Sequence, residues 1–251
     1  MRFPKSAKYK DLETIYTQCS GPGGLKVAEF LGDKMNLKAG MRLLDIGTYY
    51  GAQTCFIAKE YGVDVVGIDP WSDCAERLRV MAAKEGLSHR ILALKASVPQ
   101  TGFPSESFDA AFSATTFEMI RGTQRKAMYL ACLAEVLRVL RPGALFALAE
   151  PMHLNVPIPS DLVPVYTQGK GTGPEGWAKC FATVSETLEA VRSVGFGVLE
   201  ADYVPDGWSW WEEYATYDPD CRAEPEGEAR IIRLDGGRWL SFGYVIAEKP
   251  R

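Results

Sequence analysis

The chain has 251 residues, with 28 Lys and Arg against 32 Asp and Glu, so its formal net charge is −4. Hydrophobic residues make up 47% and charged residues 24%, which excludes a disordered chain. The mild acidity argues against nucleic-acid binding through phosphate contacts. Apolar runs such as 144–149 fall short of the roughly 20 residues that span a bilayer, and residues 1–16 resemble no secretory signal. These values predict a soluble cytoplasmic protein without nucleic-acid or membrane partners.

The cysteines and the length add two expectations. The chain is long enough for one domain with a small cap. Its cysteines contain no CxxC pair and no recognisable spacing of metal ligands, so we expect free thiols in a reducing cytoplasm and no metal site. The six positions are Cys19, Cys55, Cys74, Cys132, Cys180 and Cys221.

Hydrophobic periodicity and glycine or proline breaks predict the elements in chain order. After a Gly-Pro-Gly-Gly break, helices are expected at 25–35, 53–61, 72–85, 124–140 and 183–194. Strands are expected at 41–46, 63–68, 91–97, 108–113, 144–150, 196–204 and 238–248. Thr183 and Glu186 have the spacing of a capping box at the start of the last helix.

The order of these elements predicts an α/β fold. Five strands that mostly alternate with helices indicate a parallel sheet covered on both faces. No helix pattern separates the last two strands, so an antiparallel pairing is open to them. The stretches 151–180 and 205–237 have no clear assignment, and loops of such length are usually functional or disordered. We expect both stretches to form a cap over a substrate.

The most informative segment is 43–51, where a strand ends, the chain turns on glycines and a helix begins. Ligands of open α/β sheets bind at such carboxyl ends of strands. Gly47 and Gly51 let the backbone approach a ligand closely. Asp45 stands just before the first glycine, where a negative charge suits a cationic ligand group better than a pyrophosphate.

A second carboxylate supports a nucleoside ligand. Asp69 ends the next strand, 24 residues after Asp45, where an acid can accept hydrogen bonds from ribose hydroxyls. Pro70 and Trp71 follow, and an indole can lie on an adenine face. An adenosine with a cationic tail and no phosphate is S-adenosylmethionine.

At this point the sequence resembles the class I S-adenosylmethionine-dependent methyltransferases, and among them the small-molecule group. The resemblance covers roughly 21–150 and rests on LLDIG-x-x-x-G, VVGIDP, FPSESFD, LRVLRPG and EPM in this order. It implies a Rossmann-like sheet of seven strands, mostly parallel, with helices on both faces and a last antiparallel strand. It also implies one domain over 1–251, with segment 1–40 closing over the cofactor.

The resemblance implies a set of cofactor residues. They are Asp45, Gly47, Thr48, Gly51, Asp69, Pro70, Trp71, Ala96, Ser97 and Ser113. The sequence departs from the family pattern at two places. Tyr49 stands where the family usually has a glycine. Ala96 stands where an acid often contacts the adenine amine, so the backbone or Ser97 must do so here.

The candidates for catalysis and substrate binding each have a structural alternative. A general base is optional for methyl transfer, and His153 and then Glu118 are the candidates if one is needed. The alternative for His153 is a solvated loop position, and Glu118 can simply close the pocket.

Four aromatic residues are candidates for substrate contact: Tyr49, Trp208, Trp211 and Tyr214. The alternative for the tryptophan-rich stretch is a hydrophobic flap that packs on the body of the domain. For the cofactor candidate Ser113, the alternative is that its side chain only caps the next turn.

The predicted function is methyl transfer from S-adenosylmethionine to a nitrogen, oxygen, sulfur or carbon nucleophile on a small molecule. One alternative is a module that binds the cofactor without transferring the methyl group. Another is a nicotinamide oxidoreductase, but that class predicts GxGxxG at the first turn, where this chain has Gly47 and Gly51 separated by three residues.

Overall fold

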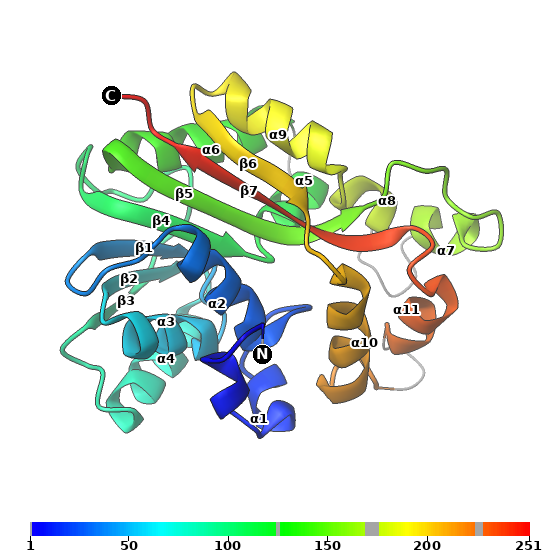
Figure 1. Cartoon of the computed structure of the whole chain (residues 1–251), viewed down its shortest axis with the longest axis horizontal. Coiled ribbons are helices and arrows are strands. Elements are labelled where there is room, and N and C mark those ends of the chain that lie inside the picture. Colours follow the sequence, from blue (N-terminus) through cyan, green and yellow to red (C-terminus); the bar gives the residue numbers. More distant parts are fainter. Residues whose placement is uncertain (1, 124–125, 169–175, 224–227) are drawn as a thin grey trace.

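A twisted sheet of seven strands runs through the computed structural model, which describes residues 2–123, 126–168, 176–223 and 228–251. The strand order is β3-β2-β1-β4-β5-β7-β6 (Figure 1). The strands are β1 Arg42–Ile46, β2 Asp64–Asp69, β3 Ile91–Lys95, β4 Phe108–Ala114, β5 Leu140–His153, β6 Gly197–Tyr203 and β7 Leu240–Glu248.

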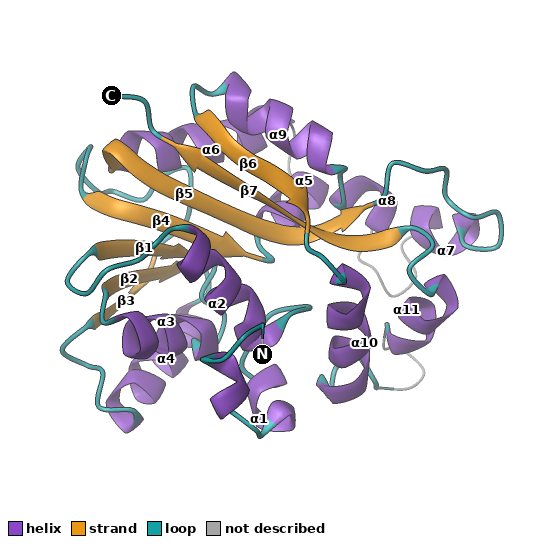
Figure 2. Cartoon of the chain, viewed as in Figure 1, coloured by secondary structure: helices purple, strands orange, loops and turns teal. Residues whose placement is uncertain are grey.

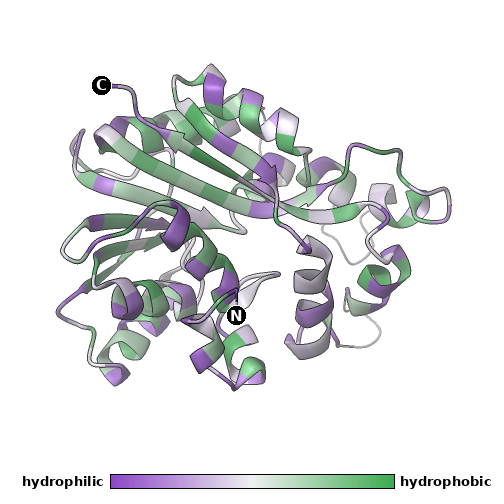
Figure 3. Cartoon of the chain, viewed as in Figure 1, coloured by the Kyte–Doolittle hydropathy of each residue, from purple (hydrophilic) through white to green (hydrophobic). Residues whose placement is uncertain are grey.

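The pairing confirms the predicted fold class. Strands β1 to β5 pair in parallel, and β7 runs antiparallel to both of its neighbours, β5 and β6. Parallel neighbours need crossover connections, which the helices supply. Because helices cover both faces, the central strands are almost continuously hydrophobic, as the colouring of β4, β5 and β7 shows (Figure 3).

The helices divide between the two faces of the sheet (Figure 2). On one face, buried side chains of α2 (Gly24–Lys34), α3 (Ala52–Tyr61) and α4 (Ser72–Lys84) form a core with the strands. On the other, α5 (Phe117–Thr123), α6 (Lys126–Val139) and α9 (Val184–Ser193) form a second core. The predicted capping box at α9 is confirmed, since the Thr183 and Glu186 side chains each accept from the other residue's backbone N–H.

A small cap lies beyond the carboxyl end of β5. It consists of α7 (Val163–Gln168), α8 (Trp177–Cys180), α10 (Gly207–Tyr217) and α11 (Ala229–Asp235). These helices enclose a third core rich in aromatic side chains, among them Tyr166, Trp177, Trp211 and Trp239. The short helices η1 (Ser6–Lys8) and α1 (Leu12–Tyr16) precede α2 near α10 (Figure 1).

Three expectations about the elements were wrong. The last two strands are separated by helices, α10 and α11, rather than by helix-free chain. Trp210 of α10 packs into the main core while Trp211 packs into the cap core, so α10 has no single apolar stripe. The short helix α5 was not expected after β4. Strand β5 begins at Leu140, so the Arg-Pro-Gly segment belongs to the strand instead of only ending a helix.

Within the described residues, no helix is both long and apolar enough to cross a membrane.

Candidate functional site

A cavity of about 560 Å³ lies where β1, β2, β3 and β4 end. The predicted cofactor residues that line it are Gly47, Asp69, Pro70, Trp71, Ala96 and Ser97. Tyr49 also lines it, as do residues of α5 and α6. The motifs that the sequence places far apart therefore meet at one edge of the sheet, as expected for strands that run in parallel.

Asp69 is held in place by the backbone on both sides of the cavity. Its two carboxylate oxygens accept hydrogen bonds from the N–H groups of Tyr49 and Trp71, each at 3.0 Å. Burial raises the pKa of Asp69, and these two N–H donors partly offset that rise. A carboxylate oxygen accepts more than one hydrogen bond, so both oxygens retain capacity for a hydroxyl pair.

Gly47 gives the cavity its floor. Its φ of +82° is favoured by glycine, and a Cβ at this position would collide with Thr116 Oγ1. The turn after β1 and the turn after β4 are therefore in direct contact. This close approach leaves a bare backbone facing the cavity, which fits a bulky nucleoside ligand.

Four predicted cofactor residues lie outside the cavity wall and brace the turn. Asp45 is buried and accepts a 2.5 Å hydrogen bond from Thr54 Oγ1, and burial raises its pKa to about 7. Ser113 Oγ donates to the Ile46 carbonyl at 2.9 Å, tying β4 to β1. The other two are Thr48, packed toward Gly67, and Gly51, which begins α3 with φ +97°.

Tyr49, at the position of the family glycine, has an unusual backbone and a stacked side chain. Its φ is +46°, a conformation that costs energy for residues other than glycine. The ring lies 3.9 Å from that of Tyr50, which in turn packs under the Arg77 guanidinium at 4.0 Å. The stack holds the Tyr49 ring at the cavity wall.

The N-terminal segment reaches the same cavity. Ser20 lines it, and the carbonyl of Ser20 accepts a hydrogen bond from Thr115 Oγ1 at the end of β4. Tyr16, at the end of α1, donates to Glu213 of the cap helix α10 at 2.9 Å. The N-terminal segment thus connects the cavity to the cap.

Neither candidate base lines this cavity. His153, at the end of β5, stacks on Trp239 with ring centroids 4.5 Å apart and pairs its Nδ1 with the Leu154 carbonyl. Glu118 is buried beside Glu150 and does not line the cavity, although the next residue of α5, Met119, does. Glu118 therefore lies in the protein interior.

The cap aromatics lie mainly in packing positions. Trp211 is 2% exposed, sits in the cap core and donates its indole N–H to the Ser241 carbonyl at 2.9 Å. Trp208 and Tyr214 are partly buried against the same core. None of the three lines the cavity at Asp69. This placement favours the flap interpretation over substrate contact.

The cavity wall also includes residues that the sequence reasoning missed. Met119 and Ile120 come from α5, and Met128 and Cys132 come from α6. No sequence signal pointed to Met119 and Ile120, because α5 itself was not predicted. The sequence showed a regular hydrophobic stripe on α6, but it did not show which end of that stripe faces a ligand.

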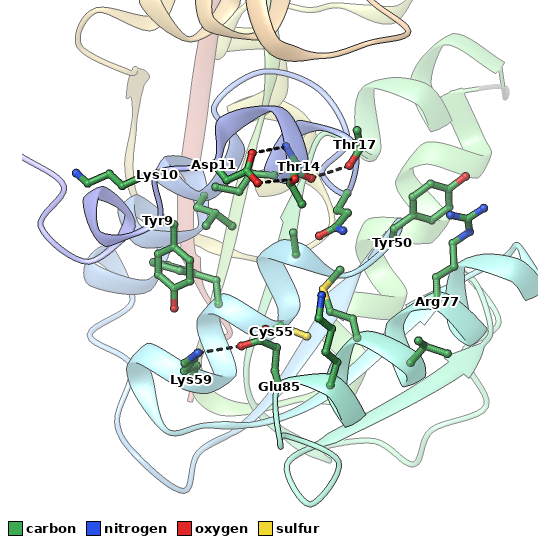
Figure 4. Close-up of a pocket in the computed structure, with 18 of the residues that line it drawn as sticks. Tyr9, Lys10, Asp11, Thr14, Thr17, Tyr50, Cys55, Lys59, Arg77 and Glu85 are labelled. Carbon is green, nitrogen blue, oxygen red and sulfur yellow. Dashed lines mark hydrogen bonds and ion pairs between the residues drawn. The ribbon is translucent and has the colours of Figure 1, made fainter.

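A larger hollow, of about 640 Å³, lies elsewhere, between α1, α3 and α4 (Figure 4). Its wall contains the Lys59–Glu85 ion pair and Arg77 directed at Tyr50. We assign the functional site to the smaller cavity, because Asp69 and the bare backbone of Gly47 face that one.

The cavity and strand order are those of a nucleoside-binding Rossmann-like domain. Residues 44–148 match a family described as a methyltransferase domain. A sterol 24-C-methyltransferase of Aspergillus fumigatus is 29% identical over 196 residues, which cover 72% of this chain and 47% of that protein. The chain spans about half the length of the curated relatives it matches.

Solved structures show the same fold. The cyclase SpnF has a TM-score of 0.72 at 19% identity, with 96% of this chain and 93% of that chain covered. A phosphoethanolamine N-methyltransferase 2 of Haemonchus contortus, bound to S-adenosylmethionine, has a TM-score of 0.73 at 18% identity, with 99% and 59% covered. Residues 44–148 thus match a methyltransferase domain, and the chain shares the fold of a methyltransferase that was solved with S-adenosylmethionine.

Proposed function

We propose that this protein transfers the methyl group of S-adenosylmethionine to a nucleophilic atom of a small molecule. The observation that carries the proposal is the single cavity at which Gly47, Asp69 and Ser97 converge from three strand ends. The names of the relatives support a small acceptor, since they describe methylation of a sterol and of phosphoethanolamine.

The residues of the cavity fit the cofactor in a simple way. Asp69 would accept hydrogen bonds from the ribose hydroxyls, and Trp71, which is 69% exposed, offers an apolar ring at the cavity rim. The bound cofactor supplies an activated methyl group on a sulfonium. The protein then has to align the acceptor and exclude water, and we propose the N-terminal segment and the cap for this role.

The remaining parts of the proposal concern the cap and the compartment. We propose that segments 151–180 and 205–237 enclose the methyl acceptor, with the described helices α8 and α10 packed around a common aromatic core. For the compartment we propose the cytoplasm, because the six cysteines are scattered along the chain and contain no CxxC pair.

The test measures binding and turnover separately. Calorimetry should detect S-adenosylhomocysteine binding to the wild-type protein, and Asp69→Ala should weaken it at least tenfold. Asp64→Asn is the matched control, because Asp64 begins the same strand but is exposed and pairs with Arg90. The proposal fails if neither S-adenosylmethionine nor its product binds at millimolar concentration.

A second candidate is cofactor binding without transfer. The observation behind it is Tyr49, whose side chain occupies cavity wall where the family has a glycine. Formation of S-adenosylhomocysteine in a mixture of metabolites distinguishes the two functions. Cofactor binding with no product in any mixture would favour the binding module.

A further inference from the structure

A group of polar side chains lies buried between α5, β5, α6 and α9, outside the cofactor cavity. Glu118 of α5 and Glu150 of β5 are 4% and 1% exposed, and their carboxyl groups lie within hydrogen-bonding reach of each other. Arg121, one turn after Glu118, donates to Tyr129 Oη at 2.8 Å and to Thr187 Oγ1 at 3.2 Å. Two acids and one cation therefore share an interior site.

The hydrogen bonding of this group is incomplete without a proton between the acids. Among the described residues, no donor reaches Glu118 Oε2 or Glu150 Oε2, and Arg121 Nε has no acceptor. Two ionised carboxylates side by side in a low dielectric repel each other strongly. One shared proton removes the repulsion, forms an O–H···O bond and leaves one carboxylate to balance Arg121.

Among the residues that the structure describes, the elements around the pair supply no second cation that acts on both carboxyl groups. Tyr129 faces it from α6, Glu186 lies near Arg121 on α9, and Cys180 of α8 packs against α5 at Gly122. Within the part of the chain that the structure describes, Arg121 is the one cation that acts on both carboxyl groups. Burial raises the pKa of both acids, and Arg121 only partly opposes this.

Helix α5 connects this group to the cofactor cavity. Met119 and Ile120 directly follow Glu118 and line the cavity. Thr116, just before α5, closes against the bare backbone of Gly47. Helix α5 thus supplies residues both to the cavity wall and to the pair with Glu150, so a shift of the helix would move the cavity wall.

We propose that Glu118, Glu150 and Arg121 are positioning residues that, while the two acids share a proton, hold α5 against β5 in the arrangement that binds the cofactor. Loss of the proton leaves an unbalanced buried charge and loosens α5. Cofactor binding is then linked to proton binding, so the dissociation constant rises with pH, by at most about tenfold per pH unit for one proton. This inference rests on the proposed function of the cavity.

The test is calorimetric titration with S-adenosylhomocysteine between pH 6 and 9. Wild-type protein should bind at least threefold more weakly at pH 9 than at pH 6. Glu118→Gln keeps a neutral donor beside Glu150, so it should bind well at pH 6 and lose the pH dependence. Glu200→Gln is the control, since Glu200 of β6 pairs with Lys34 of α2 and Tyr244 of β7, and the substitution should leave the pH dependence unchanged.

A second measurement keeps the test valid if the variant fails to fold. Wild-type titrations at pH 8 in two buffers of different ionisation enthalpy should show net proton uptake on binding. Ionisation of Asp69 would have the opposite effect and strengthen binding as pH rises, because the charged carboxylate is the form that accepts hydrogen bonds from the ribose hydroxyls. A wild-type dissociation constant that does not change with pH, or one whose dependence survives Glu118→Gln, overturns the positioning role while leaving the proposed function standing. Absence of binding at every pH overturns both.

Discussion

Tyr16 of α1 donates a hydrogen bond of 2.9 Å to Glu213 of α10, across 197 positions of the sequence. Lys26 of α2 forms an ion pair with the same carboxylate. The Tyr16 ring also stacks on that of Tyr217, at the end of α10. This contact fastens the N-terminal segment, which reaches the cofactor cavity through Ser20, to the cap.

Tyr16→Phe should release this fastening at a small cost in stability. Loss of this one partly buried hydrogen bond should lower the free energy of unfolding by about 1 kcal/mol. Because the N-terminal segment lies at the cavity, we also expect faster dissociation of S-adenosylhomocysteine, measured by stopped-flow displacement. Tyr9→Phe is the matched control, since Tyr9 bonds to Glu60 of α3 rather than to the cap. Equal dissociation rates in the two variants would contradict a role for the contact in holding the cofactor.

Gly47→Ala should disrupt the cofactor site, whereas Gly86→Ala should not. Both glycines have positive φ, +82° and +71°, so both substitutions carry the backbone penalty of about 1 kcal/mol. At Gly86 the added Cβ meets open space, whereas at Gly47 it collides with Thr116. We expect Gly47→Ala to cost at least about 2 kcal/mol in urea unfolding and to weaken cofactor binding more than tenfold. Similar losses in both variants would show that the contact with Thr116 is unimportant.

The stability of the cofactor-free protein should fall as pH rises from about 4.5 to 7. Burial raises the pKa of Asp45 and of Glu228 to about 7, so the folded chain holds protons that the unfolded chain has released. For acids with a raised pKa the stabilisation is complete below the unfolded value and is lost as pH rises through the folded value. Each such group contributes a slope of about 1.4 kcal/mol per pH unit within this window.

Asp45→Asn tests this expectation at one group. The amide cannot ionise, so the unfolding free energy should decline less steeply with pH, by the contribution of about one titrating group. Urea unfolding at pH 5, 6, 7 and 8 measures this decline. Asp161→Asn is the control, because Asp161 is exposed and its Arg238 partner lowers its pKa. An unchanged slope in Asp45→Asn would mean that Asp45 is ionised in the folded protein.

Trp211→Phe should affect the fold of the cap more than substrate binding. Its indole is buried and bonded to the Ser241 carbonyl, so the substitution leaves a small void and an unpaired acceptor. We expect a loss of about 1–3 kcal/mol in unfolding free energy, against less than 1 kcal/mol for the partly exposed Trp208→Phe. A stable Trp211→Phe protein with an altered KM for its acceptor would restore the substrate-contact hypothesis.

The sequence by itself determined the sheet and the cofactor side of the site. Local patterns were sufficient because β-branched runs such as that before Asp69, and glycines such as Gly47, reflect constraints within a few residues. Parallel strands end at one edge, so locating the ends of β1 and β2 already brought Gly47 and Asp69 together. The capping box at Thr183 and Glu186 was recognisable for the same local reason.

Only the tertiary structure decided which way side chains face and what lies between distant segments. Asp45, Thr48 and Ser113 stand in the predicted turns, but their side chains bond or pack beneath the cavity, because strand and turn geometry turns them inward. The pairing of Glu118 with Glu150 joins residues 32 positions apart on two elements, and no local pattern encodes it. The cap helices depend on a shared aromatic core rather than on a stripe facing the sheet, so their periodicity was hidden until the chain was folded.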